Sequence, residues 1–505
     1  MTKRHVPWFL MGVAILLLSV LFTPGGVTIF VPSDVRPHLL NASRMLEGQV
    51  IYKDFFQFTT PGTELVYLVL FSLYGQRGWI PNVMLIVLGL GLVWLSTAIS
   101  RQLMRGWAVF LPGCLFATVS FYHGLDPSHQ WFSVMAVLLG ILPIIEKRTS
   151  WRAATVGVLC GLASFFTQTR GLFAFMGFSV FLMWEGHRNG RGRSALLKSE
   201  AFLAAPFIST VLGTNAYFVW KAGLSRFLQS TVTFVFSHFQ AAAMGNTFGV
   251  YLINPPSLRP WYGLPWVVAY LSVHLLVPGI YLLFTVRYWQ QARHQPQYPW
   301  DRLMLINITG LFLFLSVAPA PSYFRLCVVS LPALILFVWL LTLPGRAERV
   351  LLPACWILAV LMAAVDIQHV QRHVTGYLNL PSGRTAFLNP NDYERFRWLA
   401  QHTRPGDFFL EADWANTYVA LGLRNPAPVP FVTNSDYTCP EQVRAVVEAL
   451  EARRVPLVLW SVNLDLPQNV TRAGDHLGPL RSDLRAHYHV VKTFASGDQV
   501  WEREK

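Results

Sequence analysis

Residues 42–65, ASRMLEGQVIYKDFFQFTTPGTEL, place charged side chains among aromatic and hydroxyl-bearing ones, directly before long apolar segments. Lys53 and Asp54 stand between Tyr52 and Phe55, and Glu64 follows a Thr-Pro-Gly turn. Charged groups close to a lipid bilayer are costly unless they have partners or a function. The interpretation of this stretch therefore depends on where it lies relative to a membrane.

The composition of the whole chain is that of a polytopic membrane protein. Of the 505 residues, 53% are hydrophobic and 13% are charged, and the mean hydropathy is +0.40. These values lie outside the range of soluble globular domains. The net charge of +14 comes largely from basic loops between apolar runs, so it indicates membrane topology rather than nucleic-acid binding. The five cysteines show neither a disulfide framework nor a CxxC metal knuckle.

Apolar runs of about 20 residues can cross a bilayer, and their number predicts about eleven transmembrane helices. They lie near residues 8–30, 80–100, 107–122, 129–145, 153–168, 171–184, 201–220, 265–286, 303–320, 326–343 and 350–367. The first run has the basic start of a signal peptide but no small-residue cleavage site, so we expect an uncleaved span with a cytoplasmic N-terminus. A shorter run at 62–75 predicts a helix at the membrane interface.

Basic residues alternate from loop to loop as the positive-inside rule requires. The densest cluster, GHRNGRGRSALLK at 186–198, lies between two apolar runs and predicts a cytoplasmic loop. The sequence thus predicts a transmembrane domain over 1–367, whose first outer loop is 31–79, and a C-terminal domain over 368–505 on the outer face.

The C-terminal region alternates helical and β-rich patterns three times, which indicates a small α/β domain. The three repeats of this order are residues 389–413, 439–461 and 480–503. None contains a glycine-rich phosphate loop or a GxSxG elbow, so we expect a lid or docking domain without chemistry of its own.

The first outer loop opens with a pattern that predicts a short amphipathic helix along the interface. Ser33 or Asp34 could cap its N-terminus, and Gly48 could end it. Asp34, His38 and Asn41 share one face by helical spacing. Asp34 is therefore either an N-cap carboxylate or an acid with a chemical task.

These motifs, taken in order, resemble those of GT-C glycosyltransferases, in the branch of the protein O-mannosyltransferases and lipid A aminoarabinose transferases. That family carries an Asp at the start of this loop, then a pattern like A-x-x-[LM]-L-x-G-x-x-x-Y-[RK]-D-F and a Pro-Pro or Pro-Gly turn. Here the pattern is ASRMLEGQVIYKDFFQFTTPG. YHGLDPSHQWF at 122–132 and GLASFFTQTRGLFAF at 161–175 match two further family segments. The chain departs from the family at Val35, where a Glu is usual, and at Thr60, where a Pro is usual.

The resemblance implies an enzyme of the cell envelope that transfers a hexosyl or pentosyl group from a polyprenyl-phosphate carrier. The acceptor would be an extracytoplasmic glycan, lipid or protein, and the anomeric carbon would be inverted. Such a reaction needs a general base for the acceptor hydroxyl and positive charge or a metal for the leaving phosphate. The loop patterns and the cysteines indicate a multi-pass protein of a bacterial inner membrane, with a periplasmic or extracellular C-terminal domain.

We expect Asp34 to be the general base, with Asp54 and Asp126 as supporting carboxylates or metal ligands. The expected substrate-binding residues are Lys53, Arg170, Arg325, His38, His129 and Tyr52. The sequence requires no cofactor and identifies no metal ligands, although a divalent cation, Mg or Mn, stays open. Simpler roles stay open too: snorkelling for Lys53, a turn for Asp126 and interfacial packing for the histidines and Tyr52.

A transporter or flippase of a lipid-linked sugar is the alternative from another class of protein. It would place ionisable residues near the middle of the spans and show internal repeats or paired broken helices. The sequence shows almost no acid within the apolar runs and no evident repeat. This pattern favours chemistry at the membrane surface.

Overall fold

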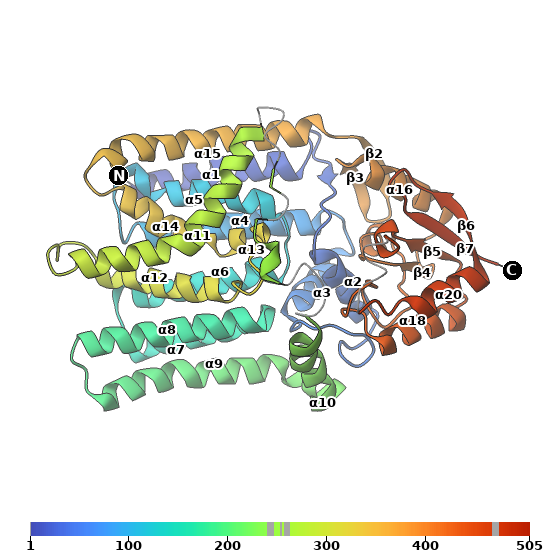
Figure 1. Ribbon diagram of the computed structural model, residues 1–505, viewed down its shortest axis with the longest axis horizontal. Helices are drawn as coiled ribbons and strands as arrows, with labels where there is room; N and C mark the ends of the chain where they lie inside the picture. The colour runs from blue at the N-terminus through green and yellow to red at the C-terminus, as the bar shows by residue number, and fades with distance from the viewer. Residues whose placement is uncertain (1, 240–246, 253–254, 257–262, 467–473, 505) are drawn as a thin grey trace. The chain divides into compact units, whose positions relative to one another are not determined.

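The computed structural model describes residues 2–239, 247–252, 255–256, 263–466 and 474–504. The chain divides into two compact units, each assembled from separate segments (Figure 1). Unit 1 comprises residues 1–20, 84–215 and 247–369. Unit 2 comprises residues 21–83, 216–246 and 370–505.

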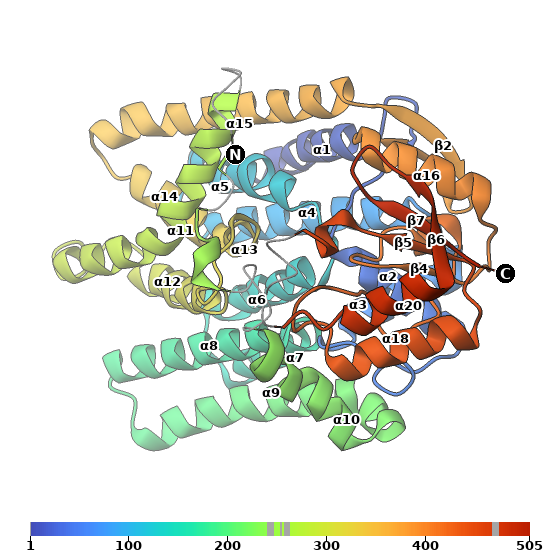
Figure 2. The same cartoon turned by 45° about the vertical axis from the view of Figure 1, so that its right-hand side comes forward.

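Unit 1 is built from helices. Its α-helices are α1 (Thr2–Leu21), α4 (Ile80–Ser100), α5 (Leu111–Leu115), α6 (His129–Glu146), α7 (Ser150–Phe166), α8 (Gln168–Arg188), α9 (Arg193–Ala222), α11 (Leu264–Gln291), α12 (Trp300–Leu315), α13 (Tyr323–Val328), α14 (Ser330–Leu341) and α15 (Arg346–Arg372). A π-helix, η2 (Phe116–Phe121), and a 3-10 turn, η3 (Tyr122–Gly124), join α5 to the loop before α6. α6 packs on α7, α7 on α8, and α8 on α12 (Figures 1 and 2).

Each of the eleven predicted apolar runs contains a helix, which confirms a polytopic helical membrane protein. Six helices in the described part of the chain are long and apolar enough to cross a bilayer: α1, α4, α6, α9, α11 and α15. The other five runs fall on α7, α8 and α12, on the α13–α14 pair, and on the broken stretch that includes α5 and η2. The number of crossings stays a prediction.

The first helix is shorter than the apolar pattern predicts. α1 ends at Leu21 rather than near residue 30. Thr23, Pro24, Gly25 and Gly26 follow, and the amide of Gly26 donates to the Thr23 carbonyl at 2.8 Å while Gly26 adopts a φ of +73°. Because proline and a left-handed glycine end helices, the apolar residues beyond this turn enter strand β1 (Thr28–Ile29) instead.

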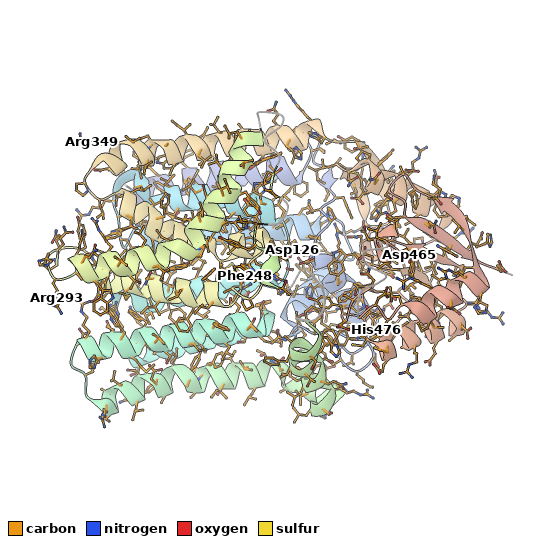
Figure 3. All side chains as sticks on the ribbon, viewed as in Figure 1. Asp126, Phe248, Arg293, Arg349, Asp465 and His476 are labelled. Atoms are coloured by element: carbon orange, nitrogen blue, oxygen red, sulfur yellow. The ribbon has the colours of Figure 1, made fainter. Side chains whose placement is uncertain are left out.

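Charged residues of unit 1 separate toward the two ends of its helices. Figure 3 shows Arg293 and Arg349 at one end of the bundle, and Asp126 toward the other end. The positive-inside prediction requires this arrangement, because it assigns Arg293 and Arg349 to cytoplasmic segments and Asp126 to an outer loop.

Unit 2 joins the first outer loop to the C-terminal region. β1 pairs in parallel with β3 (Gly383–Phe387), which pairs antiparallel with β2 (Gly376–Leu380). Phe30, next to β1, packs in the same core as Phe387 and Phe396. The predicted domains assigned loop 31–79 to the segment 1–367, whereas these contacts group residues 21–83 with residues 370–505.

The repeated helix–strand order of the C-terminal region is confirmed. The elements are α16 (Pro390–His402), β4 (Phe409–Glu411), α17 (Tyr418–Leu421), α18 (Pro440–Ala452), β5 (Leu457–Trp460), α20 (Gly478–His487), β6 (Tyr488–Thr493) and β7 (Gln499–Arg503). The strands form one sheet in the order β4-β5-β7-β6, with β4 and β5 parallel. α18 and α20 contact each other (Figure 2), and their apolar faces share a core with β4 and β5.

Two helices of the first loop pack together and fix its shape. They are α2 (Val35–Leu46) and α3 (Gly62–Tyr74). Val35 and Leu39 of α2 share a core with Tyr67 and Phe71 of α3. Gly48 follows α2 with a φ of +89°, so the predicted helix and its glycine end are both confirmed.

Candidate functional site

A buried carboxylate organises the first loop. Oε1 of Glu64, in the first turn of α3, lies 2.7 Å from Nδ1 of His38, 2.9 Å from Nε2 of Gln57 and 3.4 Å from Nδ2 of Asn41. We call these four residues the Glu64 cluster. Glu64 is fully buried, and no described group donates a hydrogen bond to its Oε2. The cluster fixes α2, the strip around Gln57 and α3 to one another.

Asp34 occupies the N-cap position of α2 without acting as a cap. Its backbone is helical (φ −60°, ψ −11°), and its side chain makes no capping hydrogen bond. A capping residue normally has extended φ and ψ and accepts a bond from the next turn. The carboxylate of Asp34 is exposed, one helical turn before His38. Asp34 therefore does not cap α2 through its side chain, and its chemical role stays a proposal.

Asp54 and Tyr52 shape the turn that follows α2. The Asp54 carboxylate accepts from the amide of Val50 at 2.7 Å, and Tyr52 adopts a φ of +68°. The Tyr52 hydroxyl donates to the Thr59 carbonyl at 2.6 Å. Burial is the main cause that raises the pKa of Tyr52 well above its usual value, and the nearby Glu64 carboxylate is the second cause. Lys53 and Asp54 are exposed. Asp54 thus has a structural role here in addition to the predicted catalytic one.

Arg44 is a buried cation that sequence reasoning passed over. Its guanidinium donates to the carbonyls of Asn425 and Ala427. Burial lowers the pKa of Arg44 to about 10. This side chain holds α2 against the C-terminal region of unit 2. No local sequence signal could have identified the contact, because the partners lie almost four hundred residues away.

Arg170 is the buried cation of unit 1. It lies in the first turn of α8 and is 3% exposed. Its guanidinium donates to the Gln130 carbonyl at 2.9 Å, to Oγ of Ser133 at 2.9 Å and to Oε1 of Gln130 at 2.6 Å. It makes no ion pair within the described part of the chain, and Arg325 lies close enough to repel it. We call Arg170, Gln130, Ser133 and Arg325 the Arg170 cluster.

The Arg170 cluster brings two of the predicted motifs together. Gln130 belongs to the segment 122–132 and Arg170 to the segment 161–175, so their hydrogen bonds join the two family-like stretches. Asp126 lies in the same first stretch, 5% exposed, and its carboxylate accepts from the Ser128 hydroxyl. This bond suits the turn role that the sequence left open for Asp126. The carbonyl of His129 accepts from the hydroxyl of Thr167, at 3.2 Å.

Asp366 is a second carboxylate that sequence reasoning did not single out. It is fully buried near the end of α15, where Nε1 of Trp266 donates to its Oδ1 at 3.1 Å. No described group donates to its Oδ2. The acid lies within the apolar run 350–367, and its spacing gives no local sign that Trp266 would be its partner.

The metal prediction is not supported by a cluster of the predicted acids. Within the described ranges, the one group of three metal-type ligands that lie within 4.8 Å of one another is Glu451, Asp483 and His487. His487 and Asp483 already pair across one turn of α20 at 2.9 Å. An i, i+4 pair on α20 explains the contact between His487 and Asp483 without a metal.

The predicted site residues fall into two sets. Asp34, His38, Tyr52, Lys53 and Asp54 belong to unit 2, where His38 joins the Glu64 cluster and Tyr52 and Asp54 share one turn. The second set consists of Asp126, His129, Arg170 and Arg325 in unit 1. Glu64, absent from the predicted set, holds the first loop together. An acid in a first helical turn usually indicates only a favourable helix-dipole interaction.

Comparison with known proteins shows the fold. No protein-family model and no curated protein matches the sequence. The structure of ArnT from Cupriavidus metallidurans in the apo state matches with a TM-score of 0.57 at 12% identity, over 99% of this chain and 98% of that one. ArnT from the same organism bound to undecaprenyl phosphate matches with a TM-score of 0.55 at 13% identity and the same coverage. The chain therefore has the GT-C fold that its motifs resemble.

Proposed function

We propose that this protein is an integral-membrane inverting glycosyltransferase that moves a sugar from a polyprenyl-phosphate carrier to an extracytoplasmic acceptor. One observation carries the proposal: Arg170 is a buried guanidinium whose described hydrogen-bond partners, Gln130 and Ser133, are all neutral. A buried guanidinium without an acidic partner is unfavourable unless an anion joins it. The phosphate of a lipid carrier is such an anion.

The cationic side of the reaction belongs to the Arg170 cluster. Guanidinium groups bind phosphate oxygens through charge-assisted, often bidentate, hydrogen bonds. Gln130 and Ser133 hold the Arg170 fork in a fixed orientation before any ligand binds. A preorganised cation stabilises negative charge as it develops on the leaving phosphate. Arg325 adds a second positive charge, and Lys53 and His129 are further candidates to contact the carrier.

The basic side of the reaction is assigned to Asp34. Its carboxylate takes the proton of the acceptor hydroxyl while that oxygen attacks the anomeric carbon. The bond from this carbon to the phosphate oxygen breaks, and the lipid phosphate leaves with the electron pair. Its exposure suits a base that meets an incoming acceptor, while the Glu64 cluster, through His38, fixes α2 beneath it. Asp54 and Asp126 are the supporting carboxylates.

The fold gives separate support for a polyprenyl-phosphate substrate. A protein of the same fold, ArnT, has been crystallised with undecaprenyl phosphate, a polyprenyl phosphate of the kind proposed here. The apolar helices of unit 1 suit a long lipid chain, and the proposed location is a bacterial inner membrane with the C-terminal region on the outer side. The sugar would be a hexosyl or pentosyl group. A divalent cation, Mg or Mn, could assist the phosphate but is not needed by the proposed steps.

The test incubates the purified protein with a panel of radiolabelled polyprenyl-phosphate sugars, in detergent and in sealed liposomes. Release or transfer of the labelled sugar by the wild type in detergent, together with loss of this activity in Asp34→Asn, supports the proposed glycosyltransferase. Carrier lipid that changes leaflet in liposomes without cleavage of its sugar bond would contradict the enzyme and support the transporter alternative.

A further inference from the structure

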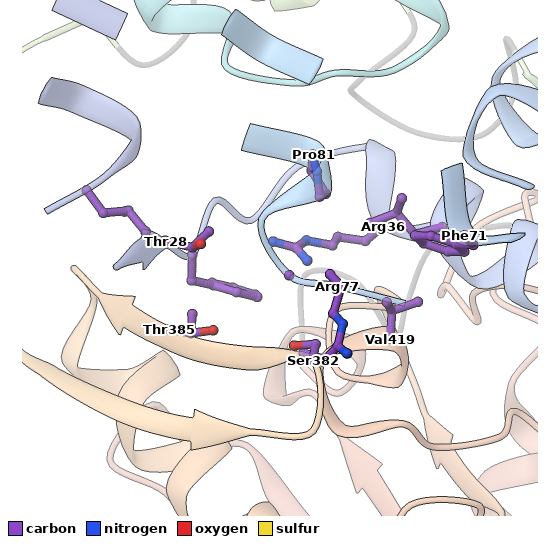
Figure 4. A pocket seen from close by; sticks show the side chains of 13 residues that line it. Thr28, Arg36, Phe71, Arg77, Pro81, Ser382, Thr385 and Val419 are labelled. Atoms are coloured by element: carbon purple, nitrogen blue, oxygen red, sulfur yellow. The ribbon is translucent and has the colours of Figure 1, made fainter. Parts of the chain in front are cut away.

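A cationic hollow lies within unit 2, and none of its lining residues is assigned to transfer. It is a pocket lined by Arg36, Arg77, Ser382, Thr28 and Thr385 (Figure 4). Arg36 reaches across it, and the guanidinium of Arg77 lies beside Ser382. The whole pocket has only about 10 Å³ of space for a water centre, room for about one water molecule. It can accept one oxygen of a ligand but not a whole phosphate.

The pocket adjoins a wider hollow that can hold such a group. The two share Thr28, Gly78 and Ser382, and the wider one is lined also by Arg384 and Trp79. It offers about 450 Å³ of the same kind of space. No acidic side chain among the described residues lines either hollow. Three arginines and three hydroxyls therefore surround a space without a lining carboxylate.

Ser382 gives an independent sign of a ligand. It is 3% exposed, and no described group hydrogen-bonds its Oγ. A buried hydroxyl without a partner costs roughly 1–3 kcal/mol, so it is retained where something else binds it. A Cβ built on Gly78 would lie 3.2 Å from this oxygen. The absent side chain at Gly78 keeps the space in front of Ser382 open.

Arg36 is oriented by contacts with the segment that precedes α2. Its Nη2 donates to the Val31 carbonyl at 2.7 Å, and its guanidinium lies 4.3 Å from the Phe30 ring centre. Asp392 attracts it from a position outside both hollows, but that carboxylate also lies 3.8 Å from Arg395. These contacts hold the Arg36 side chain among the residues that line the pocket.

Chain connectivity places this hollow next to the bilayer. Phe22 and Val27 line it just after α1 ends at Leu21, and Trp79 and Val83 line it where α4 begins. Residues that flank the ends of apolar helices lie at headgroup depth, where tryptophan is enriched. We infer that the hollow binds the phosphate of an anionic membrane phospholipid, with one oxygen on Ser382 and the charge on Arg36, Arg77 and Arg384. This inference is independent of the proposed transfer reaction.

Native mass spectrometry of the full-length protein, released from mixed micelles of phosphatidylglycerol and phosphatidylcholine, tests the site. The double variant Arg77→Gln/Arg384→Gln removes two exposed charges, and Gly78→Ala fills the space without changing charge. The double variant should lower retained phosphatidylglycerol at least about tenfold, because charge-assisted hydrogen bonds to the phosphate are lost. Gly78→Ala should also lower it, because the added Cβ would lie 3.2 Å from the Ser382 hydroxyl that binds a phosphate oxygen. The matched control, Arg397→Gln/Arg444→Gln, removes two exposed charges of unit 2 outside both hollows.

Three outcomes would overturn the inference. One is unchanged phosphatidylglycerol retention in both pocket variants. The second is an equal loss in the control, because this would show a general charge effect. The third is complete displacement of the lipid by excess inorganic phosphate, because this would show a site for the free ion. Retention that survives inorganic phosphate and falls only in the pocket variants supports the lipid site.

Discussion

The Glu64 cluster and the Arg170 cluster each hold a buried charged side chain, and the two charges have opposite sign. Each buries one charged group and surrounds it with fixed side chains: a carboxylate with His38, Asn41 and Gln57, and a guanidinium with Gln130 and Ser133. Burying a charge is costly unless it is hydrogen-bonded. The difference is that the acid lies among donors that complete a fold, whereas the cation lies beside another cation. We infer from this comparison that the first cluster acts as a scaffold, and we propose the second as a ligand site.

The largest effect is expected for Asp34→Asn, which removes the base that stands above the scaffold. Transfer should fall by about 10²–10⁴-fold, the usual contribution of a general base. Because Asn keeps the size of the side chain and its ability to cap a helix, the melting temperature should be nearly unchanged. The measurement is sugar transfer by the purified variant alongside its thermal unfolding. Activity within a few-fold of wild type would assign the base to another carboxylate.

Arg170→Gln should have the next largest effect, and it should weaken the use of the polyprenyl-phosphate sugar donor. Losing one charge-assisted contact to phosphate, about 1.5–3 kcal/mol, predicts a fall in kcat/KM for the polyprenyl-phosphate donor of about 10–100-fold. Arg188→Gln is the matched control, since Arg188 lies on the same helix and pairs with Asp301 at the exposed surface. A similar loss in both variants would show that α8 needs charge for stability and not for a ligand.

Glu64→Gln sharpens the distinction between scaffold and ligand site. Gln keeps the shape of the side chain but loses the charge that strengthens the bonds from His38 and Gln57. We expect a lower melting temperature, with turnover reduced about tenfold by misplacement of α2, and an unchanged KM for the donor. Steady-state kinetics and thermal unfolding check this. A donor KM that rises strongly with an unchanged melting temperature would instead make Glu64 a binding residue.

The smallest effect is a pH dependence of stability in unit 2, outside both clusters. Burial raises the pKa of Glu411 to about 7, although Thr417 donates to its carboxylate through its amide at 2.9 Å. The folded state therefore keeps this proton at pH values where the unfolded chain has released it. Stability should fall as the pH rises from about 4.5 to about 7, by up to roughly 3 kcal/mol.

Glu411→Gln should remove this dependence while leaving donor turnover unchanged. The measurement is the melting temperature of both proteins between pH 5 and pH 8. The wild type should lose stability across this range relative to the variant. Parallel curves for the two proteins would show that Glu411 ionises normally.

Local sequence patterns predicted the elements well. The apolar runs, the helix from Val35 to Leu46 and the helix–strand order after residue 389 depend on short-range periodicity and end signals, and the structure has them all. The first helix was overpredicted because hydropathy continues past the turn at Pro24, where backbone geometry decides the end of the helix.

The sites were only partly predictable, because their partners are distant in sequence. The family-like motifs led to Arg170, but nothing local showed that Gln130 would hold it. The opening stretch contains Glu64, yet its pairing with His38 needs the packing of α2 on α3. The arginine-lined hollow of unit 2 arises from the pairing of β1 with β3, which joins residues more than three hundred and fifty positions apart.

Equilibrium binding of radiolabelled polyprenyl phosphate, measured side by side for wild type, Asp34→Asn and Arg170→Gln, tests the central claim most directly. Because Asp34 is the proposed base and Arg170 the proposed phosphate ligand, we expect Asp34→Asn to bind the lipid like wild type and Arg170→Gln to bind it at least about tenfold more weakly. Equal binding by wild type and Arg170→Gln would contradict the account.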